Sequence, residues 1–289
     1  MQDNCKNKTI LLTGATGFIG RNVLPILSMK YNVLAPRREE LNLIDVNSVD
    51  NYFNNHKFDV VIHCAASNPS SKKGLDKWET FEKDIVSAYE NIAKYSNRVE
   101  KILHLGSGAD LDKNYNMCLI KESEFPRTIP NNPYAIAKYK ITKMILLSKN
   151  IYNLRIFGCF GPTDAKTKFI RDAIDCCLAN KEITIRQNCM FDYLYVEDLA
   201  LVFEWFIKNT PKYHDYNVST ARSISLEDIA KIVAKKMNNK NGIKILNKGW
   251  NKEYTADNSR LLSEIKNLKF TSIEDGIEKQ IEWQKTDKG

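Results

Sequence analysis

Histidine is scarce in this 289-residue chain, and the four present, His56, His63, His104 and His214, do not recur at the spacing of metal ligands. The seven cysteines form no C-x-x-C pair and no even framework. We therefore expect neither a metal site nor a disulfide scaffold. In a chain of this length such cysteines are typical of reduced thiols, which predicts a cytoplasmic protein.

Long apolar runs are also absent, since none approaches the ~20 residues that span a bilayer. The polar start MQDNCKNKT does not resemble a signal peptide. The net charge is +8, but the basic residues are scattered and form no arginine-rich tract. A membrane and nucleic acid are therefore not expected as partners, whereas a small molecule that carries a diphosphate suits such a charge.

Short apolar runs alternate with helical patterns over the first 160 residues. The alternation predicts an α/β fold, a Rossmann doubly wound parallel sheet. The expected strands are 9–12, 32–35, 59–63, 101–105 and 154–157, and the expected helices are 18–29, 45–54, 78–96 and 133–149.

Beyond Gly161-Pro162 the pattern loosens, with helices expected at 169–178, 197–208 and 225–237, a strand at 183–185, and one or two helices within 252–289. We predict a dinucleotide-binding domain over 1–162, to which 191–215 return. Segments 163–190 and 216–289 are predicted to form a smaller, mixed α/β C-terminal lobe that binds substrate.

A glycine-rich stretch stands between the first strand and the first helix: Gly14, Thr16, Gly17, Phe18, Ile19 and Gly20. Glycines there permit a tight turn and let a pyrophosphate approach the backbone. The N-terminus of the following helix offers unpaired N–H groups to the anion. The strand–turn–helix context makes this a predicted dinucleotide site rather than a packing turn.

Arg37 and Arg38 follow the second strand, where a fold that prefers NAD usually has an acid. Two guanidinium groups suit the 2′-phosphate of NADP(H). The sequence therefore favours NADP(H) over NAD(H), although solvated surface arginines would give the same pattern.

Tyr134 and Lys138 are four residues apart in a predicted helix, so they share one face. A lysine ammonium near the phenol lowers the pKa of the tyrosine and allows proton exchange near neutral pH. Ser107, directly after a predicted strand, is the candidate third member. These three residues are the predicted catalytic group.

Through these motifs the chain resembles an extended short-chain dehydrogenase/reductase of the NAD-dependent epimerase/dehydratase family. The resemblance extends over nearly the whole sequence. Further motifs that carry it lie at 59–66, 105–107, 155–162 and 193–200. Segment 40–45 resembles the NADPH-using GDP-fucose synthase and 4-keto-sugar reductase branch of that family.

The resemblance implies further site residues. Cofactor contacts are implied at Ala65, Ala66, Lys138 and Phe157. Substrate contacts are implied at Ser67, Ser107, Gly108, Lys168, Arg171 and Arg186, although each of the last three bases equally suits a solvated surface. Family members form homodimers through helices that correspond to 78–96 and 134–149. His63 and His104 are expected to pack in the core or beside the cofactor.

Departures from the family pattern narrow the expected reaction. Dehydratases carry an Asp-Glu pair where this chain has Gly108 and Ala109, and epimerising synthases have a cysteine at the position of Ala109. The loop 163–168 also lacks the histidine of those synthases. Gly158 and Phe191 replace an asparagine and an arginine that commonly contact the sugar diphosphate.

The resulting prediction is an NADPH-dependent reductase of the C4 ketone of a nucleotide-activated 4-keto-6-deoxy sugar, a hexose or heptose linked to GDP or another nucleotide, for surface polysaccharide synthesis. Two alternatives stay open: an epimerase with tightly bound NAD, and a non-catalytic dinucleotide sensor. The epimerase would use the same Ser107, Tyr134 and Lys138.

Overall fold

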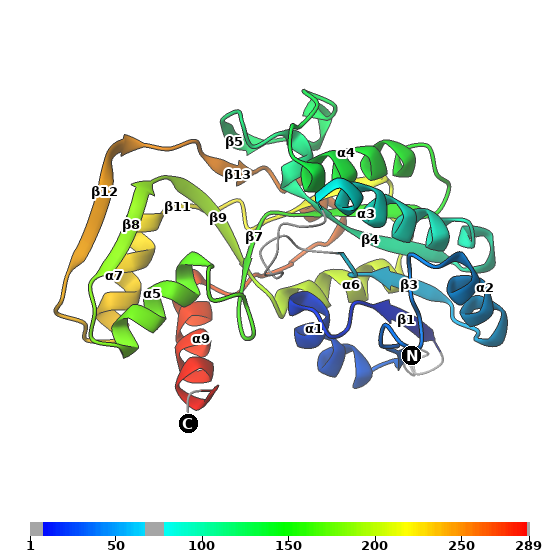
Figure 1. Cartoon of the computed structure of the whole chain (residues 1–289), viewed down its shortest axis with the longest axis horizontal. Coiled ribbons are helices and arrows are strands. Elements are labelled where there is room, and N and C mark those ends of the chain that lie inside the picture. Colours follow the sequence, from blue (N-terminus) through cyan, green and yellow to red (C-terminus); the bar gives the residue numbers. More distant parts are fainter. Residues whose placement is uncertain (1–7, 67–77, 288–289) are drawn as a thin grey trace.

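The structure is a computed structural model, which describes residues 8–66 and 78–287. Its centre is a six-stranded parallel sheet in the order β10-β6-β4-β3-β1-β2 (Figure 1). These strands are β1 (Thr9–Thr13), β2 (Asn32–Leu34), β3 (Val60–His63), β4 (Lys101–Ser107), β6 (Ile151–Ile156) and β10 (Asp215–Val218). The Rossmann fold class predicted from the alternation of strands and helices is confirmed.

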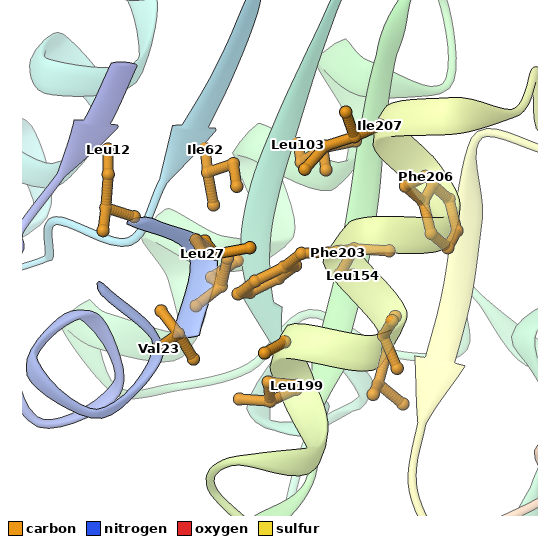
Figure 2. Packing of buried hydrophobic residues seen from close by; sticks show 14 of the residues in the cluster. Leu12, Val23, Leu27, Ile62, Leu103, Leu154, Leu199, Phe203, Phe206 and Ile207 are labelled. Atoms are coloured by element: carbon orange, nitrogen blue, oxygen red, sulfur yellow. The ribbon is translucent and has the colours of Figure 1, made fainter. Parts of the chain in front are cut away.

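Helices cover both faces of this sheet because the strands carry apolar side chains on both faces. Ile10 and Leu12 of β1 pack in one core with the helices α1 (Phe18–Ser28) and α6 (Asp198–Lys208). Figure 2 shows Leu12, Ile62, Leu103 and Leu154 of the strands near Val23, Leu27, Leu199 and Phe203 of these helices. Leu11 packs in the opposite core, with α2 (Val46–Asn55), α3 (Trp78–Ala93) and α4 (Pro133–Ile145).

The second lobe lies beside the six-stranded sheet (Figure 1). Its main sheet has the order β11-β9-β13-β5, with β7 paired to β9, and a second sheet pairs β12 with β8. Their bounds are β5 (Met117–Ile120), β7 (Gly158–Phe160), β8 (Ile183–Asn188), β9 (Met190–Tyr195), β11 (Ser223–Ser225), β12 (Ile243–Trp250) and β13 (Tyr254–Ala256). The helices are α5 (Phe169–Leu178), α7 (Leu226–Lys236), α8 (Ser259–Glu264) and α9 (Ile273–Asp287), and a third apolar core joins α5, α7 and α9.

The lobe boundary in the structure differs in detail from the sequence expectation. The segment 191–215 was expected to return to the dinucleotide domain, and α6 within it does pack on the sheet core. Residues 191–195, however, belong to β9 of the second lobe's sheet, and the returning strand is Asp215–Val218. This strand runs parallel to β6, with Tyr216 opposite Leu154 and Val218 opposite Ile156. Tyr216 and Val218 are buried there, although the local sequence pattern did not predict a strand at these residues.

Short 3-10 turns connect some of these elements: η3 (Ser96–Arg98) precedes β4, η4 (Gly108–Leu111) follows it, and η5 (Glu122–Glu124) follows β5. Among the described residues, no helix is both long enough and apolar enough to cross a membrane. Within the same residues no cluster of three His, Cys, Asp or Glu side chains could hold a metal ion.

Candidate active site

The glycine-rich turn between β1 and α1 is shaped for close backbone contact. Gly14 has φ +72°, and a Cβ there would lie 2.6 Å from the backbone nitrogen of Ala65. A Cβ on Gly20 would lie 2.3 Å from the carbonyl oxygen of Gly14. Neither position therefore admits a side chain without backbone movement.

Gly17 is the N-cap of α1, and neither a side-chain cap nor an acidic residue in the first turn satisfies the helix terminus. The first N–H groups of a helix have no partner within it and attract anions. Phe18 and Ile19, also predicted here, pack against the sheet core and hold this first turn in place. The helix terminus fits a pyrophosphate.

A cavity of about 280 Å³ extends from this turn along the carboxyl edge of the sheet. Its wall includes Thr16 and Gly17 of the turn, Ala65 and Ala66 after β3, and Arg38. Leu41, Asn42, Leu43 and Ile44 and the α3 residues Asp84, Ile85 and Ala88 complete the wall. The combination of an anion-binding turn and an apolar slot fits a nicotinamide dinucleotide.

The two candidate arginines differ in position. Arg38 lines the cavity, whereas Arg37 is outside its described lining and donates its backbone N–H to Oε2 of Glu40 at 2.8 Å. The structure therefore places one guanidinium, not two, in the cavity wall.

Helix α4 carries the Tyr134 and Lys138 pair. Asn132 caps the helix by accepting a hydrogen bond from the Ala135 N–H at 2.9 Å, and Pro133 occupies the first turn, where it needs no donor. Lys138 Nζ donates to the carbonyl oxygen of Leu105 at 2.5 Å and lies 3.3 Å from Nε2 of His104. It stands 5.9 Å from the centroid of the Tyr134 ring.

Ser107 ends β4, and its Oγ accepts a hydrogen bond from the Ala109 N–H at 3.2 Å. A hydrogen bond from Ser107 favours the ionised form of Tyr134, but burial is the larger effect and raises the pKa of that phenol. This is opposite to the direction expected from the four-residue spacing, because burial and the charge of Asp110 raise the pKa more than Ser107 lowers it. Burial also lowers the pKa of Lys138 to about 8.

Of the remaining predicted contact residues, Gly108 and Phe157 lie next to each other in the structure. A Cβ on Gly108 would lie 2.7 Å from Cε1 of Phe157 and 2.5 Å from the Tyr254 hydroxyl oxygen, so Gly108 faces both rings. Ser67 lies outside the described residues.

The three predicted substrate-binding bases are dispersed. Lys168 is the N-cap of α5. Arg171 donates to the carbonyl oxygen of Asp164, and its guanidinium lies 5.0 Å from the Trp283 ring centroid. Arg186 is exposed on β8, alternating with the buried Ile183 and Ile185, so it faces away from the core of the second lobe.

Two residues near Ser107 were not identified from the sequence. Tyr254 arrives from β13 in the second lobe, and Lys113 Nζ lies 3.9 Å from the centroid of its ring. Lys113 as a whole is exposed, but its ammonium lies over the buried Tyr254 ring, and desolvation there, followed by the charge of Lys168, lowers the pKa of Lys113 to about 8. Neither residue belongs to a motif, so no local signal points to them.

The departures at Gly158 and Phe191 have structural reasons. A Cβ on Gly158 would lie 2.3 Å from the carbonyl oxygen of Asp192, because β7 and β9 approach closely there. Phe191 stacks on Tyr193 with centroids 5.2 Å apart and lies 5.3 Å from the Tyr254 ring. An aromatic group thus stands where relatives commonly have charge.

His63 and His104 lie under the cavity as buried neutral groups. Thr13 Oγ1 and His63 Nδ1 are 2.8 Å apart, and the two imidazole centroids are separated by 5.3 Å. Burial, with the neighbouring Lys138 charge, lowers the pKa of both rings, that of His63 to about 3.

The glycine-rich turn and the cavity beside it have the features of a dinucleotide site at the carboxyl edge of a parallel sheet. Residues 10–219 match the NAD dependent epimerase/dehydratase family. The chain belongs to that family.

Two curated relatives illustrate the sequence similarity. A dTDP-D-glucose 4,6-dehydratase from Dictyostelium discoideum is 26% identical over 80% of this chain, which spans 62% of the length of that relative. A GDP-L-colitose synthase from Yersinia pseudotuberculosis is also 26% identical, over 78% of this chain and 81% of the relative.

Solved structures show the same fold at lower identity. A GDP-L-fucose synthetase from Naegleria fowleri bound to NADP has a TM-score of 0.84 at 19% identity, covering 98% of this chain and 95% of that one. A GDP-mannoheptose C4 reductase from Campylobacter jejuni with NADP bound has a TM-score of 0.82 at 18% identity, covering 99% of each chain.

Proposed function

We propose that this protein reduces the C4 ketone of a nucleotide-activated 4-keto-6-deoxy sugar, a hexose or heptose, with NADPH. The observation that carries the proposal is that Ser107, Tyr134 and Lys138 come together at the carboxyl end of β4. The Lys138 charge also acts on Cys64, which lines the glycine-rich cavity. The similar structures that bind NADP, a GDP-L-fucose synthetase and a GDP-mannoheptose C4 reductase, support this substrate class.

The chain's own residues supply binding and proton transfer in this reaction. When bound, the nicotinamide supplies the hydride. Tyr134 donates the proton to the alkoxide that develops at C4, and Ser107 hydrogen-bonds the same oxygen. An ammonium has three N–H donors; Lys138 directs two at Leu105 and His104, which leaves one for the ribose of the cofactor.

The preference for simple reduction follows from residues next to Ser107. Gly108 and Ala109 carry no group able to exchange a proton with carbon. Gly108 also has no space for a larger side chain, since the Tyr254 hydroxyl and Phe157 occupy the position of its Cβ. Elimination of water, and epimerisation by proton exchange at carbon, therefore lack the acid and base that they require at these positions.

We assign basic residues to the two anionic groups of the ligands, the 2′-phosphate of NADPH and the diphosphate of the nucleotide sugar. We assign the 2′-phosphate of NADPH to Arg38, because this guanidinium lines the cavity. We assign the sugar diphosphate to Lys113 and Lys168, whose charges are close enough to repel each other. An anion between two such lysines relieves that repulsion.

The test is the absorbance of reduced nicotinamide in the presence of purified protein and a panel of 4-keto-6-deoxy nucleotide sugars made in situ by a dehydratase. Consumption of NADPH on one sugar, and its loss in Tyr134→Phe, is the expected result. A protein that consumes no cofactor on any sugar but is purified with NAD bound would overturn the reductase and favour the epimerase.

The cellular setting of this activity is part of the same proposal. We propose a cytoplasmic homodimer that serves surface polysaccharide synthesis, with α3 and α4 at the interface and with substrate bound by the C-terminal lobe. Sizing of the purified protein in solution tests the dimer, and a monomer at working concentrations would contradict it.

A further inference from the structure

Tyr254 reaches the catalytic group from a distant part of the chain. It begins β13, which lies between β9 and β5 in the second lobe, and its backbone pairs with Phe191 and Met117. Its side chain is buried, and its ring lies 5.0 Å from that of Phe157 and 5.3 Å from that of Phe191. Three strands and two aromatic neighbours therefore determine where its hydroxyl points.

That hydroxyl lies against the backbone at Gly108. Its oxygen lies 2.5 Å from the position of a Cβ on Gly108, the residue directly after the catalytic serine. The Ser107 side chain opposes the rise in the pKa of Tyr254, as it does for Tyr134, so its hydroxyl lies close to both phenols. The serine hydroxyl thus has two phenols as neighbours, one from each lobe.

The hydrogen count determines how these three hydroxyls are arranged. Ser107 has one hydrogen and two lone pairs, and one lone pair already accepts from the Ala109 N–H. Serine can donate to only one phenol, so in an arrangement that bonds both phenols the other one donates to it. Burial raises the pKa of Tyr254 well above its usual value, and the nearby Tyr134 and Asp110 act in the same direction. Tyr254 therefore keeps its hydrogen near neutral pH and is available as the donor.

We propose that Tyr254 is a positioning residue, which donates its phenol hydrogen to Ser107 Oγ and thereby directs the serine hydrogen toward Tyr134 and the substrate oxygen. A hydroxyl that accepts a hydrogen bond becomes a stronger donor. Tyr254 strengthens Ser107 as the second hydrogen-bond donor to the developing alkoxide, and through it the second lobe completes the catalytic group. This role rests on the proposed reduction.

Tyr254→Phe tests the role by removing one oxygen while keeping the ring between Phe157 and Phe191. We expect kcat to fall about 10- to 100-fold, less than the loss of a direct oxyanion donor, with the KM for sugar and the Kd for NADPH nearly unchanged. The matched control is Tyr139→Phe, since Tyr139 packs on the same apolar cluster through Phe125, at 5.1 Å between centroids. This control should retain wild-type kcat, and both variants should unfold at similar temperatures.

A second measurement does not depend on turnover. In protein labelled with 3-fluorotyrosine, the ¹⁹F resonance of Tyr134, assigned by its loss in Tyr134→Phe, reports the ionisation of this phenol. Tyr254→Phe should raise the pKa of Tyr134 because Ser107 becomes a weaker donor, whereas Tyr139→Phe should leave it unchanged.

The two measurements separate failure of this role from failure of the proposed reaction. A folded Tyr254→Phe protein with wild-type kcat, or with an unchanged Tyr134 titration, would overturn the positioning role. If the wild type reduces no sugar, the proposed function fails, and the ¹⁹F titration alone still decides whether Tyr254 acts on Ser107 and Tyr134.

Discussion

Arg155 donates its Nε–H to both carboxylate oxygens of Asp110, at 2.8 and 3.1 Å, and both side chains are completely buried. Asp110 lies in η4, three residues after Ser107, and Arg155 lies in β6. Arg155 also donates to Asp215 and Asn217 of β10. A buried ion pair thus joins the turn that follows Ser107 to the edge of the parallel sheet.

Breaking this pair should strongly destabilise the protein. Asp110→Ala removes the carboxylate that is paired with the buried Arg155 guanidinium. We expect the free energy of unfolding to fall by about 3–5 kcal/mol. Urea unfolding measures the loss. The control is Glu278→Gln, in an exposed pair with Lys236, which should cost less than about 1 kcal/mol. Equal losses in the two variants would contradict the anchoring role of Asp110.

Arg38 and Arg37 should differ in their effect on cofactor binding. Arg38→Ala should raise the KM for NADPH about 10- to 100-fold, since a charge-assisted hydrogen bond contributes roughly 1.5–3 kcal/mol, and should leave the KM for NADH nearly unchanged. Arg37→Ala is the matched control because Arg37 is outside the described cavity lining. Initial rates with each cofactor measure both effects, and an equal or larger effect of Arg37→Ala would refute the assignment.

The affinity for the nucleotide sugar should fall at alkaline pH. Desolvation and the charge of Lys168 lower the pKa of Lys113 to about 8, so its ammonium is lost as the pH rises through that value. The KM for sugar should therefore rise above pH 8, and this rise should disappear in Lys113→Met, whose KM is high throughout.

Lys240→Met, which changes an exposed lysine in the second lobe, serves as the control and should keep the wild-type profile. A Lys113→Met profile that coincides with that of the wild type would rule out a diphosphate contact from this residue.

Acid should destabilise the protein through His63. Its folded-state pKa is about 3, below the ordinary 6.5, so the unfolded state binds more protons between these values. The free energy of unfolding contributed by this group falls as the pH drops below 6.5, by about 1.4 kcal/mol per pH unit. Urea unfolding of wild type and His63→Gln at a series of pH values measures the difference.

Comparison with His63→Gln is needed because buried carboxyls act in the opposite direction. Burial raises the pKa of Asp164 to about 6, so this group favours the folded state as the pH falls through 6. The difference between the two proteins cancels such contributions. Parallel stability curves for wild type and variant would show that His63 is protonated equally in both states.

Local patterns predicted most of the dinucleotide-binding half. Helix α1, for example, was expected at 18–29 and spans Phe18–Ser28, because strong apolar periodicity and the glycine turn both define it. The second lobe was less predictable. Strand β12 (Ile243–Trp250) is almost wholly exposed, so it has no alternation of apolar and polar residues to reveal it.

The sequence by itself determined the glycine-rich anion site, the shared face of Tyr134 and Lys138, and the alternation that produces a parallel sheet. Each depends on residues close together in the chain, where backbone geometry alone sets the arrangement. Only the tertiary structure decided that Tyr254 meets Ser107, that Arg38 rather than Arg37 lines the cavity, and that the pKa of Tyr134 is raised. These depend on burial and on contacts between distant strands, because desolvation is set by everything that packs around a group and not by its neighbours in sequence.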